Sequence, residues 1–284
     1  MGVRLIDVMH LGCDRVIAAH EVRGLIVDPG PTTGLEALLA GLGDEPRGLL
    51  LTHIHLDHAG AAGVLVRRFP ALRVHVHEVG APHLADPSKL LASAGRLYGD
   101  QMESLWGEVA PVPEANLVAL AGGEEVEGFR VEHTPGHASH HVCYLDADSG
   151  DAFVGDVAGV RIPPSKLTLM PTPPPEIDVQ AWERSLALVR GWRPRRLHLT
   201  HFGAVDDPER QIERALEALR TEAEGVRAED REAFRAEIEG RIEAVGDDEV
   251  AARMRQAIPP EQIWLGLERY WRKRAEREAE GAGR

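Results

Sequence analysis

Three histidines and one aspartate lie within six positions of this chain, in the stretch THIHLDH that follows an apolar run. These residues are His53, His55, Asp57 and His58. Imidazole and carboxylate groups together suit zinc, iron or manganese ions. Four such groups in six positions are typical of one half of a site for two metal ions, so we expect the remaining ligands later in the chain.

Three further candidate ligands each follow an apolar, strand-like run. His137 lies in HTPGHASHH after the run FRVEH, Asp156 ends the run AFVGD, and His201 follows the run RLHLT. Ligand sites on sheet scaffolds gather at the carboxyl ends of strands. The three positions therefore predict that these side chains meet the THIHLDH loop at one edge of a sheet.

The elements that must position these residues belong to a mixed pattern of strands and helices. Short apolar and β-branched runs between turn residues predict strands at residues 24–28, 48–52, 73–77, 129–133, 142–146, 151–156 and 196–200. Apolar residues at helical spacing predict helices at residues 33–42, 59–69 and 179–189. This mixture indicates strands and helices packed in layers.

The pattern changes after Ala204, and residues 205–284 are predicted to form a C-terminal helical region with helices at 208–219, 229–245, 248–258 and 260–280. The apolar patch on the last helix is expected to pack against the core, with a substrate wall or a dimer contact as alternatives; it comprises Trp264, Leu267, Tyr270 and Trp271. A helical insertion at about 82–110 is expected to pack against the core, and the alternative is that it roofs the site.

Composition narrows the class of protein. Hydrophobic residues make up 43% and charged residues 27% of the 284 residues, as in globular proteins. The net charge of −14 disfavours a nucleic-acid partner, because nucleic-acid binders carry basic surfaces. No long apolar run predicts a membrane helix, and no secretory signal is evident, so we expect a cytoplasmic protein with Cys13 and Cys143 as buried thiols.

In its order of ligands, the chain resembles the metallo-β-lactamase fold superfamily. The matching motifs are HxHxDH at residues 53–58, the later ligands already described, and Asp28 in the early stretch LIVDPGP. The resemblance covers Leu25 to Gly203. It implies an α+β fold of four αββα layers over residues 1–204, which form the catalytic domain with the metal site at one edge of its two sheets.

The resemblance also implies a role for each ligand. It divides them into His53, His55 and His137 for a first ion, Asp57, His58 and His201 for a second, and Asp156 between both. Asp28 is expected to order the HxHxDH loop through hydrogen bonds. The implied cofactors are two divalent ions, with zinc favoured and iron or manganese as alternatives.

The chemistry implied by such a centre is hydrolysis of a small molecule. Two ions stabilise a bridging hydroxide and polarise the scissile group, and Asp57 takes up and returns the proton. The helical C-terminal region makes the chain similar to glyoxalase-II-like thioesterases, so we expect a thioester, ester or lactone as substrate. The segment from His58 to His137 is longer than in a compact glutathione thioesterase, which leaves the substrate unassigned. Candidate substrate contacts are Lys166, Tyr98 and His140, and beyond these Arg269, Tyr270 and Lys273.

Other enzyme classes on this fold stay open at this point. The alternatives are a persulfide dioxygenase that holds one iron, or a phosphodiesterase. The missing export signal disfavours a β-lactamase. A homodimer is possible. His75 and His77 share one face of a predicted strand and are interpreted as ordinary strand residues, as is His10 in its own segment.

Overall fold

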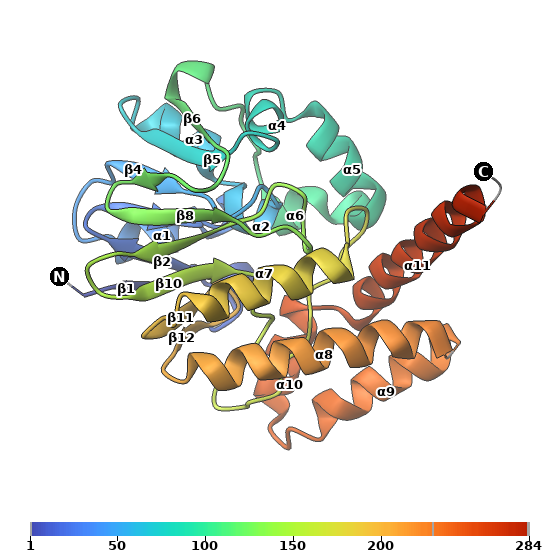
Figure 1. The fold of residues 1–284 in the computed structure, drawn as a ribbon. Coiled ribbons are helices and arrows are strands. Elements are labelled where there is room, and N and C mark those ends of the chain that lie inside the picture. The colour runs from blue at the N-terminus through green and yellow to red at the C-terminus, as the bar shows by residue number, and fades with distance from the viewer. Residues whose placement is uncertain (1, 229, 283–284) are drawn as a thin grey trace.

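The computed structural model describes residues 2–228 and 230–282, and its centre is a pair of six-stranded sheets (Figure 1). The first sheet has the order β1 (Arg4–Asp7), β2 (Ala18–Val22), β3 (Leu25–Val27), β4 (Gly48–Leu50), β5 (Arg73–His77) and β6 (Leu117–Leu120). The second has the order β12 (Gly203–Val205), β11 (Arg196–Leu199), β10 (Asp151–Gly155), β9 (Val142–Asp146), β8 (Phe129–His133) and β7 (Glu125–Val126).

The two sheets pack face to face over a shared apolar core. Phe129, Tyr144 and Phe153 of the second sheet are buried in one cluster with Leu25 and Leu50 of the first. Burying these aromatic and branched side chains between the sheets stabilises the sandwich. The parallel pairs β3–β4, β4–β5 and β10–β11 direct the carboxyl ends of several strands to one edge of the sandwich.

Helices cover both outer faces of the sheets. The outer face of the first sheet packs against α1 (Leu35–Gly41) and α3 (Ala62–Arg68) through a cluster that includes Leu38, Leu49 and Leu65. The outer face of the second packs against α7 (Val179–Gly191) and α8 (Pro208–Ala228), with Trp182 and Leu197 fully buried. These four layers confirm the predicted α+β class and αββα architecture.

Five strands escape prediction, namely β1, β2, β6, β7 and β12. They contain two to five residues each: β1, β2 and β7 carry charged side chains, and β6 and β12 are apolar but only four and three residues long. The helix predicted at 59–69 is also wrong in its limits, because α2 (Leu56–Ala59) ends before Gly60 and α3 follows separately. Asp57 and His58 therefore lie in a short helix, where a loop was expected.

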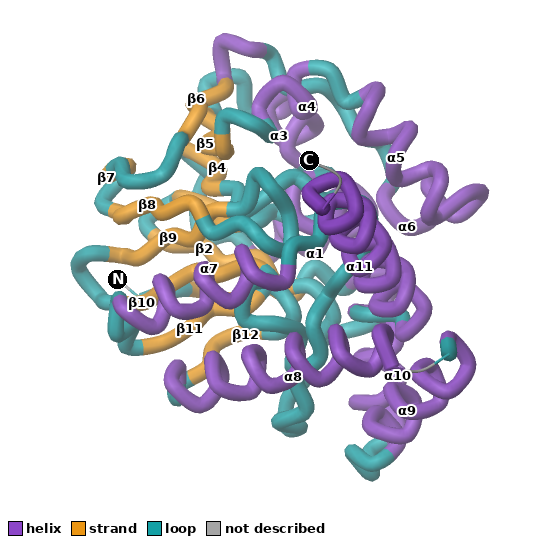
Figure 2. The backbone as a smooth tube through the Cα atoms, turned by 45° about the vertical axis from the view of Figure 1, so that its right-hand side comes forward, coloured by secondary structure: helices purple, strands orange, loops and turns teal. Residues whose placement is uncertain are grey.

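The insertion and the C-terminal region gather at one end of the sandwich (Figures 1 and 2). The insertion contains α4 (Ala81–Ala85), α5 (Ser88–Tyr98) and α6 (Met102–Trp106), and the C-terminal region contains α8, α9 (Arg231–Glu243), α10 (Asp248–Ala257) and α11 (Pro260–Ala282). Trp264 and Leu267 are buried and share one cluster with the second sheet, which confirms the expected core packing of that patch.

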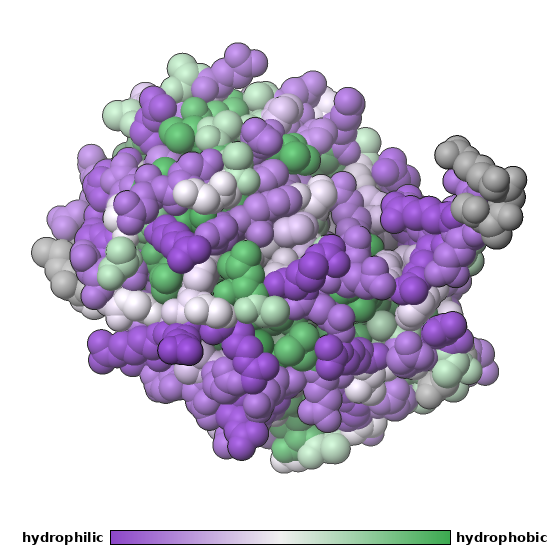
Figure 3. Space-filling view, viewed as in Figure 1, coloured by the Kyte–Doolittle hydropathy of each residue, from purple (hydrophilic) through white to green (hydrophobic). Residues whose placement is uncertain are grey.

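In the view of Figure 3, hydrophilic residues cover most of the surface where the C-terminal helices lie, with scattered apolar residues among them. Acidic and basic residues pair between helices here, as in Arg255 of α10 with Glu239 of α9 and Arg220 of α8 with Glu183 of α7. In the described ranges, no helix is both long enough and apolar enough to cross a membrane.

Two glycines in the C-terminal helices predict opposite effects of the same substitution. A Cβ at Gly266 of α11 would overlap the carbonyl oxygen of Thr172, whereas a Cβ at Gly240 of α9 would meet no atom within 4 Å. We expect Gly266→Ala to destabilise the protein by about 2 kcal/mol through overpacking. Gly240→Ala should stabilise it by about 0.5–1 kcal/mol, because alanine favours helix. Denaturant unfolding measures both, and equal shifts for the two variants would contradict the described packing of α11.

Candidate metal centre

The seven predicted ligands meet at the edge of the sandwich where the strands end. His53 and His55 follow β4, His137 lies between β8 and β9, Asp156 directly follows β10, and His201 follows β11. Asp57 and His58 lie in α2. Because the ligands come from both sheets and from a helix between them, the fold itself brings together residues up to 148 positions apart in the chain.

Three imidazole nitrogens form the first cluster. His53 Nε2 lies 3.0 Å from His55 Nδ1 and 3.2 Å from His137 Nε2, and His55 Nδ1 lies 2.9 Å from His137 Nε2. Nitrogens bound to one zinc ion at 2.0–2.1 Å in a tetrahedron lie about 3.3 Å apart. The cluster therefore has the spacing of three ligands of one ion.

The second cluster lies beside the first and shares Asp156 with it. Asp57 Oδ2 lies 3.7 Å from His58 Nε2 and 3.4 Å from His201 Nε2. Asp156 Oδ1 faces this cluster at 3.3 Å from His58 Nε2, whereas Asp156 Oδ2 faces the first cluster at 3.3 Å from His137 Nε2. One carboxylate thus presents one oxygen to each cluster.

Backbone carbonyls set the orientation and tautomer of two imidazoles. His137 Nδ1 donates to the carbonyl of Pro171 at 2.7 Å, and His201 Nδ1 donates to the carbonyl of Val16 at 2.8 Å. A neutral imidazole that donates through one nitrogen keeps a lone pair on the other. Nε2 of both residues is therefore an acceptor or a metal ligand.

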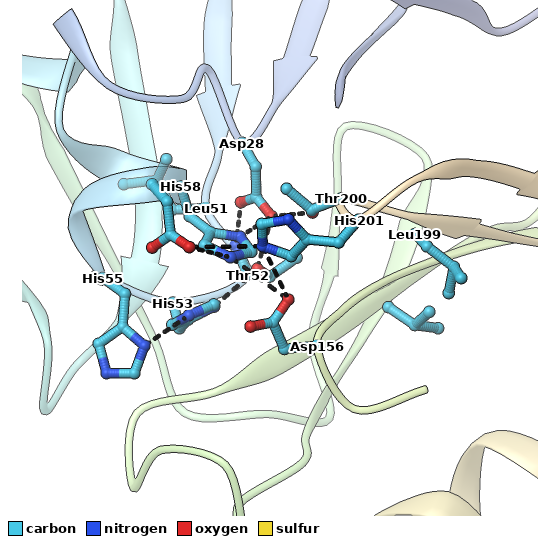
Figure 4. Close-up of polar contacts among 12 residues, drawn as sticks. Asp28, Leu51, Thr52, His53, His55, His58, Asp156, Leu199, Thr200 and His201 are labelled. Carbon is cyan, nitrogen blue, oxygen red and sulfur yellow. Dashed lines mark hydrogen bonds and ion pairs between the residues drawn. The ribbon is translucent and has the colours of Figure 1, made fainter. Parts of the chain in front are cut away.

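Asp28 sets the orientation and tautomer of two more imidazoles, that of His58 directly and that of His53 through Thr52. It accepts from His58 Nδ1 at 2.8 Å, from the amide of Thr52 at 2.8 Å, and from the hydroxyls of Thr52 at 2.7 Å and Thr200 at 3.0 Å (Figure 4). Since the single hydroxyl proton of Thr52 goes to Asp28, its oxygen accepts from His53 Nδ1 at 3.1 Å. In their neutral forms, His53 and His58 thus keep the lone pair of the inward nitrogen.

The charge of the site favours bound cations. Burial alone would lower the pKa of His58, but the carboxylates of Asp156, Asp57 and Asp28 raise this pKa well above its usual range. Burial, followed by the neighbouring imidazole of His137, lowers the pKa of His55 to about 3. The second cluster therefore attracts positive charge, while His55 stays neutral and free to bind a metal.

Unpaired buried atoms show that the residues fit a metal. His58 Nε2 and Asp156 Oδ1 are fully buried and approach each other at 3.3 Å, but neither makes a hydrogen bond within the described part of the chain. Buried polar atoms are normally paired, because an unpaired one costs about 1–3 kcal/mol. Both atoms point into the second cluster, where a cation would bind both of them.

A cavity of about 430 Å³ opens above the two clusters. His55, Asp57, Asp156 and His201 contribute to its floor. Its walls come from α5, α6, the segment 171–176 and the connection between α10 and α11. The insertion therefore roofs the site, which corrects the expectation that it serves mainly as core packing.

The predicted substrate contacts separate into two groups. Tyr98 and His140 line the cavity, whereas Lys166 is exposed and lies outside the set of cavity-lining residues. Arg269 and Lys273 donate to the carbonyl of Pro175 at the rim of the cavity. Tyr270, a residue of α11, is partly buried and packs against the core. Lys166 is thus wrong as a contact within this cavity.

The sequence prediction missed His10. Its ring is buried, stacks on Trp106 at 5.5 Å and lines the cavity. A lone histidine outside any motif gives no signal in the sequence. His75 and His77, on β5, are buried strand residues, and no metal-binding group among the described residues includes them.

Comparison with known proteins identifies relatives of the site-bearing part of the chain. A family model described as Metallo-beta-lactamase superfamily matches residues 16–201. The metallo-beta-lactamase fold-containing protein ST1585 of Sulfurisphaera tokodaii is 30% identical over 164 residues, which cover 55% of this chain and 60% of that protein. A hydroxyacylglutathione hydrolase of Enterobacter sp. is 31% identical over 141 residues, which cover 50% of this chain and 45% of that one. The chain thus spans about half the length of these curated relatives.

Solved structures share the fold. The crystal structure of ST1585 from Sulfolobus tokodaii superimposes with a TM-score of 0.67 at 25% identity, covering 76% of this chain and 85% of that one. The structure of TTHA1623 in a di-iron-bound form gives a TM-score of 0.51 at 29% identity, covering 68% and 86%.

The hydrogen bonds of Asp28 predict that it controls metal affinity. Asp28→Asn preserves the shape but replaces one acceptor oxygen by a donor, so the side chain no longer accepts from His58, Thr52 and Thr200 together. We expect metal affinity to fall about 10- to 100-fold. Competition with a chromophoric chelator measures this, with exposed Asp44→Asn as the control. Unchanged affinity in a folded Asp28→Asn protein would contradict the role of Asp28.

Proposed function

Since the chain belongs to the metallo-beta-lactamase superfamily, we propose that it is a binuclear metal-dependent hydrolase that cleaves a thioester, ester or lactone. The observation that carries this proposal is the carboxylate of Asp156, which turns one oxygen toward each of two ligand clusters. A one-metal enzyme would not need the second cluster of Asp57, His58 and His201.

Each cluster would hold one divalent ion. His53, His55 and His137 would bind the first, and the second would be bound by Asp57, His58 and His201, with Asp156 between them. Zinc fits imidazole and carboxylate ligands, and so do iron and manganese. The di-iron form of the relative TTHA1623 keeps iron as a strong alternative to zinc.

When bound, two such ions lower the pKa of an attacking water and polarise the scissile carbonyl. Asp57 is the residue placed to move protons, because its side chain is 24% exposed and lines the cavity, whereas that of Asp156 is 3% exposed. Burial raises the pKa of Asp57, but His58 and His201 outweigh burial and hold this pKa below its usual range. Asp57 thus stays ionised at neutral pH, and from its place in the cavity it would accept the proton of the water and return it to the leaving group.

A thioester is the first substrate class to test. A hydroxyacylglutathione hydrolase is among the relatives, although this chain covers 45% of its length. The carbonyl of such a substrate would lie over Asp57, within the cavity. Tyr98 and His140, which line the same cavity, are proposed substrate contacts. Burial, followed by His55, lowers the pKa of His140 to about 3, so His140 would act as a neutral hydrogen-bonding group.

A persulfide dioxygenase and a phosphodiesterase remain the competing functions. The complete second cluster favours hydrolysis over a one-iron oxygenase. A panel of S-D-lactoylglutathione, aryl esters, lactones and bis-p-nitrophenyl phosphate, with oxygen uptake measured on glutathione persulfide, separates the three. Turnover of an acyl substrate supports the proposal. Oxygen uptake without acyl hydrolysis would overturn it, as would cleavage of the phosphodiester alone.

Removing Asp57 tests the proton-transfer step. Asp57→Ala should lower kcat for the preferred acyl substrate at least about 100-fold, because it removes both a ligand and the proton acceptor. Circular dichroism should show an unchanged fold. Exposed Asp44→Ala is the control and should keep wild-type kcat. Full activity of a folded Asp57→Ala protein would rule out this role for Asp57.

A further inference from the structure

The wall that α5 gives to the cavity above the metal centre carries one row of apolar residues, while Lys89, Ser93 and Tyr98 of the same helix also line the cavity. Leu90, Ala94 and Leu97 of α5 all line it and stand at positions i, i+4 and i+7, so they form one face of the helix. Ala92 of the same helix is exposed to solvent. The apolar face of α5 is therefore turned toward the site and not only toward the core.

Apolar side chains continue from this wall to the ligands themselves. Ile54 and Leu56 alternate with the ligands of the HxHxDH loop and line the cavity. Ile258, between α10 and α11, and Val79, which is 46% exposed, also line the cavity. Apolar surface thus runs from the place where the scissile carbonyl would lie to the roof.

Charged groups are few on these walls. The cationic side chains of lysine and arginine that line the cavity are Lys89 and Arg255, within the described residues. Arg255 already pairs with Glu239 at 2.7 Å and with Glu243 at 3.8 Å. A glutathione group carries two carboxylates, and on the walls beside the metal centre it would meet one lysine without an acidic partner among the described residues, because Arg269 and Lys273 lie farther out, on the carbonyl of Pro175.

We infer that the acyl group of the substrate is an apolar aliphatic chain that lies along Leu90, Ala94 and Leu97. This inference rests on the proposed hydrolase function and names its substrate class. Leu90 and Leu97 are about 10 Å apart along α5 at 1.5 Å per residue, a length comparable with an extended octanoyl chain. Hydrolysis adds water across the acyl C–S or C–O bond and releases the apolar carboxylic acid together with the thiol or alcohol.

A homologous series of acyl thioesters tests the inference. The probes are the acetyl, butanoyl, hexanoyl and octanoyl thioesters of N-acetylcysteamine, which keep one neutral leaving group, with S-D-lactoylglutathione as comparator. We expect kcat/KM to rise about two- to fourfold for each added methylene, the factor that follows from burying one CH2 group. We also expect octanoyl thioester to exceed S-D-lactoylglutathione in kcat/KM.

Two tryptophan variants of α5 test where the acyl chain of the substrate lies. Ala94→Trp fills the cavity wall and should lower the ratio of octanoyl to acetyl kcat/KM about tenfold. Ala92→Trp adds the same side chain on the solvent face and should leave the whole series unchanged. Melting temperature confirms that both variants fold.

The outcomes distinguish the two proposals. Hydrolysis of the series with no dependence on chain length, or an unchanged ratio in folded Ala94→Trp, would overturn the inference and leave the hydrolase intact. Failure to hydrolyse any member of the series, S-D-lactoylglutathione, or the aryl esters and lactones of the panel above would overturn the inference together with its premise, the acyl hydrolase. A rising series that Ala94→Trp flattens and Ala92→Trp does not would support both.

Discussion

The structure of the site depends on one constraint: its buried carboxylates require positive charge beside them. Asp28 and Asp156 are almost fully buried, and Asp57 lies next to them at the floor of the cavity. Burying a carboxylate without compensation is unfavourable. Five imidazoles surround these groups, yet hydrogen bonds to Pro171, Val16, Thr52 and Asp28 direct the lone pairs of four of them inward. Divalent cations bound there would supply the missing positive charge and would bind those lone pairs at once.

Asp28 links this charge balance to the fold. Thr52 follows β4 of the first sheet, and Thr200 follows β11 of the second, and both hydroxyls donate to Asp28. The carboxylate therefore ties together the edges of the two sheets at the same place where it orients His58. Packing of the sandwich and geometry of the ligands depend on each other, since a shift between the sheets would move the two clusters apart.

The ligands could be predicted from the sequence because histidine and aspartate at strand ends are chemically specific. His53, His137 and Asp156 all lie where that reasoning expects them. The roof could not be predicted, because an amphipathic helix such as α5 presents the same pattern whether its apolar face meets a core or a cavity. His10 was missed for a related reason, since only the fold brings it against Trp106 of α6. Short strands such as β7 carry too few residues for a periodic signal.

Metal content tests the central claim most directly. The protein would be purified without added metal, and its metals would be counted by inductively coupled plasma mass spectrometry against protein concentration. The account predicts about two divalent ions per chain, one for each ligand cluster that Asp156 joins. One iron ion per chain would contradict the binuclear centre and support the oxygenase in its place.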